Sequence, residues 1–538
     1  ITYEEARELL CLFILKMEEL VLVNNGESFP ELFKLFETVS TDQAYTFGGV
    51  DREGRDATND LTYMLLDTCA LHPRSADPAA RIHQGSPPEY MERIAQVYLK
   101  GIPLPQLFSD EIYIESLLKH YPTTLENARD YSIVGCVEPV ASDDHFGNTD
   151  CANMNLAIPF LQALKGQEHD LWRYGPGERT AHLLINFFSH ISKNKGKITD
   201  IVQARCERAR EKRAQKRGLH RYDPPAGMSE FLERYQARLN ELARSEFTEQ
   251  QGMEKEHRTN FQTPLASSLY PGCLESGKDA TEGGTTFNSC GIQAVGITDV
   301  ADSLHAIDEV VFKKEQFALG EVIEAMNDNF AGEKGGKIRA ALLAVPKFGD
   351  DCSPEATAWV NRVMEIYNRA LDSVESCPRN GRYAAGYYAL NLANIFGKST
   401  PALPSGRLKG VPLANSIVPH YGAQQSDLFS ALNAISGVDF VEHAENGVTA
   451  TLSIDAGLFL GPEGVENLAG LFKTFLTGGG MQLQPNVLDR KILLDAYENP
   501  EKYPDLLVRI AGYCEYFINL SDELKRDIIN RSYYSAAL

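Results

Sequence analysis

Apolar residues recur at helical spacing in several long stretches of the chain. The first stretch, residues 2–22, begins with Thr2 and Glu5, which have the spacing of a capping box. Its apolar positions share one helical face: Leu9, Leu10, Phe13, Ile14, Met17 and Leu20. The same periodicity predicts further helices over residues 152–165, 302–312, 354–375 and 464–477.

Shorter apolar runs between these segments are typical of strands. Residues 132–137 form such a run between Asp130 and Pro139, which predicts a buried strand that ends in a loop. Residues 481–484 are also strand-like. Short strands that alternate with longer helices over this length favour an α/β barrel or an open α/β sheet over an all-α or all-β fold.

Two segments depart from this pattern. Charged residues dominate between about 200 and 260, and we interpret this segment as a pair of solvated surface helices, with a partner-docking face as the alternative. Residues 398–425 are rich in proline and glycine and are predicted to form a loop.

Composition narrows the class of protein. The chain has 538 residues, 52 basic and 74 acidic side chains, a net charge of −22 and a hydrophobic fraction of 43%. That fraction is typical of a globular protein, and the acidic balance argues against a nucleic-acid binder, whose affinity depends on neutralising phosphates. No window approaches 18 consecutive apolar residues, so we expect no membrane-spanning helix.

The start of the chain and its cysteines bear on whether it is a fragment and on the compartment in which the protein lies. Ile1 is the first residue and no secretory signal pattern follows it, so we expect a fragment of a longer protein. The 10 cysteines are scattered without a CxxC pair, which gives no recognisable zinc or iron–sulfur motif. Scattered cysteines are typical of reduced thiols in a cytosol, so we expect a cytoplasmic protein.

The segment 135–139, with the sequence GCVEP, carries the first candidate chemistry. A Cys between a glycine and a proline, at the end of a predicted strand, is placed on a tight loop where its side chain can face a cavity. Cys136 with Glu138 could act as a nucleophile and its base, or as a hydrogen-atom abstractor with an acid/base partner. A buried Cys beside a surface Glu explains the same residues equally well.

Three other patterns leave alternatives open. Gly512 interrupts the apolar run 507–517, and a turn glycine with positive φ would explain it. The glycine-rich segment 271–285 could cradle a phosphate, but it matches neither GxxxxGK[ST] nor GxGxxG, so nucleotide binding is not favoured. A Cys–His hydrolase would need a base such as His145 or His420, and no local signature selects either.

Taken together, these segments resemble one enzyme family. The sequence RIAGYCEYF at 509–517 is similar to the glycyl radical box, and GCVEP is similar to the thiyl loop, of the pyruvate formate-lyase-like glycyl radical enzymes. Further segments resemble the same family in the same order, so that the likeness spans nearly the whole chain: residues 47–67, 273–284, 300–307 and 498–513.

The resemblance implies roles for four residues. Gly512 would store a backbone radical, because a carbon without a side chain can flatten and be stabilised by the amides on both sides. Cys136 would carry the thiyl radical that abstracts hydrogen from the substrate, and Glu138 would be the acid/base residue. Asp150, fourteen residues after Cys136, resembles an Asp of the diol dehydratases that binds a substrate hydroxyl.

The family also implies an architecture. It has an α/β fold with a ten-stranded barrel, built from two antiparallel half-barrels with surrounding helices, and we expect the first half-barrel to be incomplete here. Residues 1–400 would form the barrel domain, partial at its N-terminus and with a charged helical insertion at about 200–260. Residues 401–538 would form the C-terminal glycine radical domain.

The resemblance further implies an oxygen-sensitive, anaerobic lyase of the dehydratase type, in which Glu138 assists elimination. The alternatives are a decarboxylase or C–C lyase, and a non-catalytic truncated subunit. Gly135 precedes Cys136 where pyruvate formate-lyase proper has a second Cys, which disfavours acyl transfer to coenzyme A. No permanently bound cofactor or metal is expected; a radical-SAM activase would install the glycyl radical, and the family is commonly homodimeric.

Overall fold

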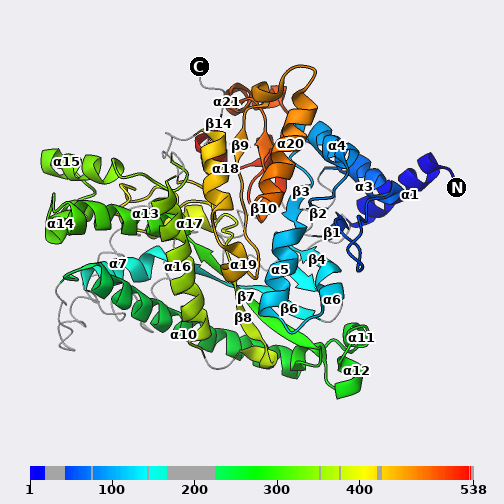
Figure 1. The fold of residues 1–538 in the computed structure, drawn as a ribbon, viewed down its shortest axis with the longest axis horizontal. Helices are drawn as coiled ribbons and strands as arrows, with labels where there is room; N and C mark the ends of the chain where they lie inside the picture. Colours follow the sequence, from blue (N-terminus) through cyan, green and yellow to red (C-terminus); the bar gives the residue numbers. More distant parts are fainter. Residues whose placement is uncertain are drawn as a thin grey trace, which may run out of the picture.

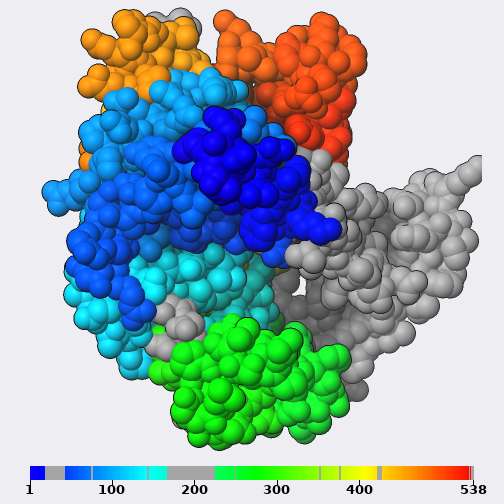
Figure 2. All heavy atoms as spheres, turned by 90° about the vertical axis from the view of Figure 1, so that its right-hand side faces the viewer, coloured from blue at the N-terminus to red at the C-terminus, as the bar shows by residue number. Residues whose placement is uncertain are grey.

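The computed structural model has an α/β fold in which parallel sheets are flanked by helices (Figure 1). It describes residues 1–17, 43–73, 77–141, 145–166, 224–350, 353–374, 377–420, 427–531 and 533–534. Figure 2 shows the N-terminal residues, in dark blue, on the surface of the molecule. There helix α1 (Tyr3–Met17) packs on α3 (Asp60–Leu71), with Cys11 Sγ 3.5 Å from Thr68 Oγ1.

The first sheet is built from two consecutive strand–helix–strand units. Its elements follow in the order β1 (Ala44–Gly48), α3, β2 (Asp77–Ile82), α4 (Pro88–Leu99) and β3 (Gln106–Ser109). These three strands are parallel, as helical crossovers require, and β10 (Gln482–Leu483) joins β3 antiparallel. Helix α20 (Gly464–Thr477) packs on α4, where the Phe472 ring meets the edge of Tyr98 at 5.1 Å. The sheet therefore joins segments from opposite ends of the chain.

The second sheet contains the parallel strands β6 (His145–Asn155), β7 (Phe287–Val295) and β8 (Arg382–Gly386). Every residue of β7 is buried, as expected for a central strand of a parallel sheet that is covered on both faces. The β6–β7 register shifts between Asn148 and Ala152, which marks a bulge in β6. This irregularity lies next to Asp150.

One helix crosses beneath this sheet. Helix α10 (Met228–Asn260) runs along the lower edge of the molecule as drawn in Figure 1, and it packs against α7 (Ala157–Lys165) and α16 (Pro354–Asp372). Its fully buried side chains recur every four residues: Phe231, Tyr235, Leu239, Ala243 and Phe247.

The prediction of two solvated helices between about 200 and 260 was therefore wrong for its second helix. Although α10 carries many charges, it buries one whole face in the core. The first of the two predicted helices lies outside the described residues.

The remaining strands are short. Strands β9 (Ser453–Ile454), β11 (Asn486–Val487) and β14 (Tyr533–Tyr534) form a parallel sheet. Two antiparallel hairpins pair β4 (Tyr131–Val134) with β5 (Glu138–Ala141), and β12 (Leu507–Arg509) with β13 (Cys514–Tyr516). Within the described part of the chain, these sheets are separate and none of them closes into a barrel.

The other helices connect and cover these sheets. They are α5 (Asp110–His120), α6 (Leu125–Arg129), α11 (Pro264–Ser267), α12 (Cys273–Ser276), α13 (Ile297–Ile307), α14 (Leu319–Asn327), α15 (Gly332–Leu343), α17 (Leu392–Ser399), α18 (Leu428–Ser436), α19 (Phe440–His443), α21 (Arg490–Glu498) and α22 (Asp522–Asn530). Shorter helical turns are η2 (Ala280–Glu282), η3 (Asp308–Lys313), η4 (Pro378–Asn380), η5 (Ala456–Phe459), η6 (Pro500–Lys502) and η7 (Phe517–Asn519). Among the described residues, no helix combines the length and apolar character needed to cross a membrane.

Several predicted elements are confirmed. Helix α20 has the bounds predicted from periodicity, and the Thr2 hydroxyl accepts from the Glu5 amide at 3.2 Å, as a capping box requires. The helix predicted over 152–165 was partly wrong, because the strand β6 extends to Asn155 and the helix begins only at Ala157.

We expect the buried face of α10 to be essential for stability. The Phe231 ring lies 5.2 Å from that of Phe160 and is fully buried, so Phe231→Ala should lower the free energy of unfolding by about 3–5 kcal/mol. Exposed Glu233 on the same helix is the control, because Glu233→Ala should change it by no more than about 0.5 kcal/mol. Denaturant titration measures both, and equal effects would contradict the burial of this face.

Candidate active site

Cys136 occupies the tip of the β4–β5 hairpin. Val134 pairs with Glu138, so that residues 135–137 form a three-residue turn. Gly135 has a φ of +62°, and a Cβ there would lie 3.3 Å from both oxygens of the Glu138 carboxyl group. The Tyr113 hydroxyl donates to the Val137 carbonyl at 3.0 Å and ties the turn to α5. The predicted strand before Cys136 is present as β4, and the loop that follows it is this turn. The expectation that the strand is buried was only partly right, because Ser132 and Val134 are exposed.

Gly512 occupies the tip of the second hairpin, β12–β13. Arg509 pairs with Cys514, and across the turn between them the Ile510 amide donates to the Tyr513 carbonyl at 3.0 Å. Gly512 has a φ of +83°, in the left-handed region that favours glycine. The turn therefore favours glycine at this position, independently of any chemistry.

The two hairpin tips are in direct contact. A Cβ added to Gly512 would overlap Cys136 Sγ and would lie 2.8 Å from Cys136 Cβ. Real Cβ atoms do not approach other heavy atoms so closely, so the sulfur occupies the space that any larger residue would fill. The structure thus brings together two of the residues predicted from the sequence motifs.

Buried polar contacts hold the Gly512 hairpin in place. The Arg509 guanidinium is fully buried and pairs with the Asp77 carboxylate of β2 at 2.7 Å. The Asn486 side chain accepts from the Arg509 amide at 2.7 Å and donates to its carbonyl at 2.9 Å, as a strand partner would. These contacts link the hairpin to the first sheet and to β11.

The electrostatic environment keeps Cys136 protonated. Burial raises the pKa of the Cys136 thiol well above its usual value, and the negative charges of Glu138, Asp77 and Asp150 raise it further. The positive charge of Arg509 acts in the opposite direction and does not overcome them. Since a thiolate is the reactive form of a nucleophilic Cys, this site favours chemistry of an intact S–H group.

Glu138 is buried beside this thiol. Its carboxyl group accepts from the Tyr388 hydroxyl at 2.7 Å, from the Val137 amide at 2.7 Å and more weakly from Thr149. Burial, followed by the charge of Asp150, raises the pKa of Glu138 to about 8. A carboxyl group in this range is mostly protonated at neutral pH and can exchange a proton with a bound molecule.

Asp150 lies in the bulged part of β6 and is exposed to solvent. Its charge raises the pKa values of both Cys136 and Glu138, which places it within electrostatic reach of the two hairpin residues. The structure thus brings Gly512 into contact with Cys136 and places Asp150 close enough to Cys136 and Glu138 for its charge to act on both.

The histidines considered as bases lie elsewhere. His145 packs between the rings of Tyr121 and Phe287, and burial lowers its pKa to about 3. His420 pairs with buried Asp299 at 2.8 Å. Among the described contacts neither ring touches Cys136, so a Cys–His hydrolase is not supported.

The glycine-rich segment 271–285 forms tight turns that enclose one of its own carboxylates. Asp279 accepts from the amides of Thr263 and Thr281 at 3.0 Å each and from the Ser267 hydroxyl at 2.8 Å. These donors, two of which lie before the segment, are therefore occupied by Asp279 and do not form a phosphate cradle.

Sequence reasoning missed two parts of this site. Tyr388 and Asp77 each contact a motif residue but lie far from it in the chain, with no motif of their own. It also missed a group of candidate metal ligands. In the described part of the chain these come together at Cys151, Glu254 and Cys290 rather than around Cys136.

Comparison with known proteins supports the family resemblance of the segments 135–139 and 509–517. The family model for pyruvate formate lyase-like proteins matches residues 1–190 and 207–397, and the glycine radical model matches residues 413–518. Among curated proteins, the chain is 29% identical to (2S)-3-sulfopropanediol dehydratase of Klebsiella oxytoca, over 96% of this chain and 57% of that protein. It is 26% identical to trans-4-hydroxy-L-proline dehydratase of Clostridioides difficile, over 90% of this chain and 56% of that protein.

Solved structures give the same result. The B12-independent glycerol dehydratase from Clostridium butyricum superposes with a TM-score of 0.83 at 28% identity, covering 99% of this chain and 62% of that one. A glycyl radical enzyme from Archaeoglobus fulgidus has the same TM-score of 0.83, also at 28% identity, with 99% of this chain and 62% of that one covered. The chain thus spans less than two thirds of the length of these relatives. Because the first family model matches well over half of its residues, the chain belongs to the pyruvate formate lyase-like family.

Proposed function

We propose that this chain forms the catalytic part of a glycyl radical lyase of the dehydratase type. The observation that carries the proposal is the contact between Gly512 and Cys136, with the buried carboxyl group of Glu138 beside it. The dehydratases among its relatives, which are named for sulfopropanediol, hydroxyproline and glycerol, support this reaction class.

In this proposal Gly512 stores the radical. Loss of one α-hydrogen leaves a carbon that can flatten between two amides, because no side chain opposes planarity. The stored radical then removes the hydrogen of the Cys136 S–H group and restores the glycine. This exchange needs van der Waals contact between carbon and sulfur, and the absence of space for a Cβ at Gly512 supports it.

The Cys136 thiyl radical would next abstract a hydrogen atom from a substrate carbon that bears a hydroxyl group. Glu138 would give its proton to the neighbouring hydroxyl, which leaves as water, and would recover a proton from the hydroxyl on the radical carbon. The product radical finally takes back the hydrogen of Cys136, so that the thiyl radical is regenerated. The raised pKa of Glu138, about 8, suits this exchange in both directions.

Asp150 is proposed to bind a substrate hydroxyl. It is exposed to solvent while its charge acts on both Cys136 and Glu138, so a hydroxyl that it accepts from would lie near both groups. A hydroxyl-bearing substrate is consistent with the names of the similar dehydratases.

A decarboxylase or C–C lyase is the second candidate. An indoleacetate decarboxylase of Tractidigestivibacter scatoligenes is 26% identical, but only over 51% of this chain and 33% of that protein. The match to dehydratases covers far more of the chain, so elimination is favoured. Release of carbon dioxide, rather than of an aldehyde or an unsaturated product, would favour the decarboxylase over the dehydratase.

We further propose the domain architecture of the whole protein and the partner that activates it. In the whole protein, residues 1–400 belong to a ten-stranded barrel of two half-barrels, and residues 401–538 form the glycine radical domain. A radical-SAM activase installs the radical in an anaerobic cytoplasm, because a glycyl radical reacts with oxygen. The chain's match to the glycine radical model supports the need for such a partner.

Two substitutions separate radical storage from catalysis. After anaerobic activation, the protein should show the EPR doublet of a glycyl radical, since one α-hydrogen remains on Gly512. Gly512→Ala should abolish the doublet, because the methyl group overlaps Cys136 and the backbone has a φ of +83°. Cys136→Ser should keep the doublet and lose turnover. If the correctly folded Cys136→Ser variant lost the doublet, the radical would not be stored on Gly512 before it reaches Cys136, which contradicts the proposal.

Glu138→Gln tests the proton transfer. Turnover should fall by roughly 10²–10⁴-fold while the EPR doublet remains, because the amide has the shape of the acid but cannot deliver its proton. In the unsubstituted protein, Glu138 donates only while protonated, so turnover should decline as pH rises through about 8. A pH profile that is flat from 7 to 9 would exclude Glu138 as the proton donor.

Asp150→Asn should shift that pH dependence. The negative charge of Asp150 is one cause of the raised pKa of Glu138, so its removal lowers that pKa. We therefore expect the alkaline decline in kcat to move to lower pH, together with a raised KM for the substrate. An unchanged midpoint with intact EPR signal would show that Asp150 does not act on Glu138.

A further inference from the structure

Three cysteines and one carboxylate meet behind the bulge of β6. Cys151 belongs to β6, Cys290 to β7, Glu254 to α10, and Cys377 lies just before η4. The Cys290 thiol is in hydrogen-bonding contact with those of Cys151 and Cys377. All three cysteines are free, and the ligand atoms of Cys151, Glu254 and Cys290 lie within 4.8 Å of one another. The cluster is thus assembled from four segments far apart in the chain.

The spacing is close to that of a tetrahedral metal site. Zinc binds sulfur at about 2.3 Å and carboxylate oxygen at about 2.0–2.2 Å, so neighbouring ligand atoms in a tetrahedron lie roughly 3.5–3.8 Å apart. Cys290 Sγ is 3.9 Å from Glu254 Oε1. That separation is already close to the expected one. Cys377 contacts Cys290 but does not belong to the group within 4.8 Å, so its side chain would have to move toward Cys151 and Glu254 to complete the tetrahedron.

The surroundings of the cluster orient its ligands. Glu254 Oε1 accepts from the Asn148 side chain at 3.1 Å, while Oε2 forms an ion pair with Arg379. The Arg379 guanidinium also lies 3.4 Å from Cys290 Sγ. Hydrogen-bonded carboxylate ligands of this kind are typical of metal sites, and the arginine offsets part of the negative charge of three thiolates and a carboxylate.

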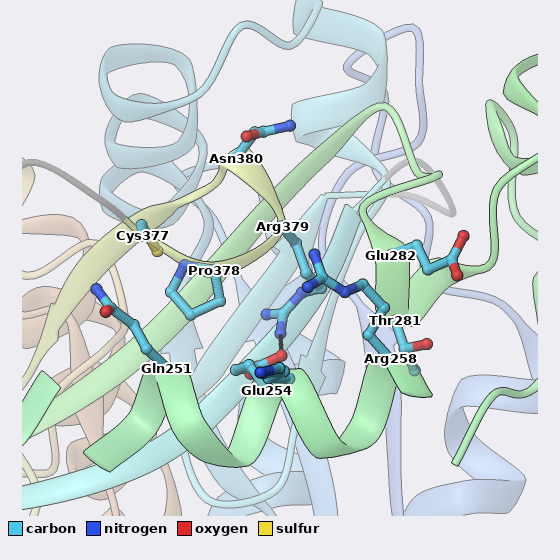
Figure 3. A pocket seen from close by; sticks show the side chains of 10 residues that line it. Gln251, Glu254, Arg258, Thr281, Glu282, Cys377, Pro378, Arg379 and Asn380 are labelled. Atoms are coloured by element: carbon cyan, nitrogen blue, oxygen red, sulfur yellow. Dashed lines mark ion pairs between the residues drawn. The ribbon is translucent and has the colours of Figure 1, made fainter. Parts of the chain in front are cut away.

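The cluster has a route to solvent. A pocket of about 250 Å³ opens beside it, lined among others by Glu254, Cys377 and Arg379. In Figure 3 the side chains of Arg379 and Glu254 point toward each other. Arg379 and Asn380 hold φ angles of +59° and +56°, which residues with a side chain seldom adopt. The strained turn delivers Cys377 and Arg379 to the cluster, as expected where the surrounding structure fixes a functional loop.

We propose that Cys151, Cys290, Cys377 and Glu254 bind one zinc ion as a closed, four-ligand structural site. Three sulfur ligands and one oxygen ligand favour a thiophilic ion with tetrahedral preference, which is the character of Zn²⁺. Binding replaces the three S–H protons, which pass to solvent. The ion would join β6, β7, α10 and the turn before β8, and would hold the bulge that contains Asp150. This inference does not depend on the proposed radical chemistry.

Metal content and a cobalt probe test this site in the unsubstituted protein. Protein purified anaerobically with reductant should contain one zinc per chain by elemental analysis. After removal of zinc, Co²⁺ should produce the near-ultraviolet charge-transfer absorption of cobalt–thiolate bonds, with visible bands of tetrahedral intensity. If the folded, reduced apoprotein binds neither Zn²⁺ nor Co²⁺ with these signals, the proposal is overturned.

Single substitutions identify the ligands. Cys377→Ser should lower the cobalt–thiolate absorption by about one third, since one of three thiolates is lost, and Glu254→Gln should weaken zinc binding while keeping all three thiolates. Cys69→Ser is the control, because Cys69 is buried and free but contacts Tyr45 far from the cluster. Equal loss in Cys69→Ser, or a Cys290 disulfide in place of bound metal in the purified protein, would contradict the site. The EPR doublet of Gly512, measured separately, reports on the radical proposal alone.

Discussion

The contact between the tips of two β-hairpins is the constraint on which the rest of the site depends. Gly512 is fixed by two independent requirements: its backbone has a φ of +83°, and the sulfur of Cys136 occupies the place where a Cβ would be. Either requirement alone would favour glycine, and together they exclude every other residue. A turn glycine and a radical-bearing glycine are therefore compatible explanations, because the same missing side chain permits the turn and the contact with sulfur.

The two tips meet because buried polar groups anchor each hairpin to a different part of the fold. The Arg509–Asp77 ion pair fixes the Gly512 hairpin to β2, and the Tyr113 hydroxyl fixes the Cys136 turn to α5. Arg509 is fully buried, so loss of its partner would leave an uncompensated charge in the interior, which costs about 3–5 kcal/mol. Polar contacts of this kind fix position more sharply than apolar packing, because they satisfy only one geometry.

The sequence predicted the features that a single short segment encodes, and it missed those that depend on contacts between distant segments. Helix α20 follows from its own apolar period, and Cys136 and Gly512 stand in recognisable motifs. Strand β6 was partly missed because its sequence, HFGNTDCANMN, has no alternation of apolar and polar residues. The buried apolar face of α10 was missed because charged residues stand between its apolar positions in the sequence. Tyr388 and Asp77, and the meeting of Cys151 with Cys290, depend on which strands lie side by side, and no short segment encodes that.

The same burial that positions these groups also selects their chemistry. Desolvation and the charge of Asp150 raise the pKa values of both Cys136 and Glu138, so the site holds a neutral thiol beside a largely neutral carboxyl group. A nucleophilic cysteine needs the reverse, namely a nearby cation that stabilises its thiolate. A hydrogen-atom donor, by contrast, must keep its S–H bond, and an acid that assists elimination must keep its proton. The environment therefore disfavours ionic attack by Cys136 and is compatible with the proposed transfer of its hydrogen atom.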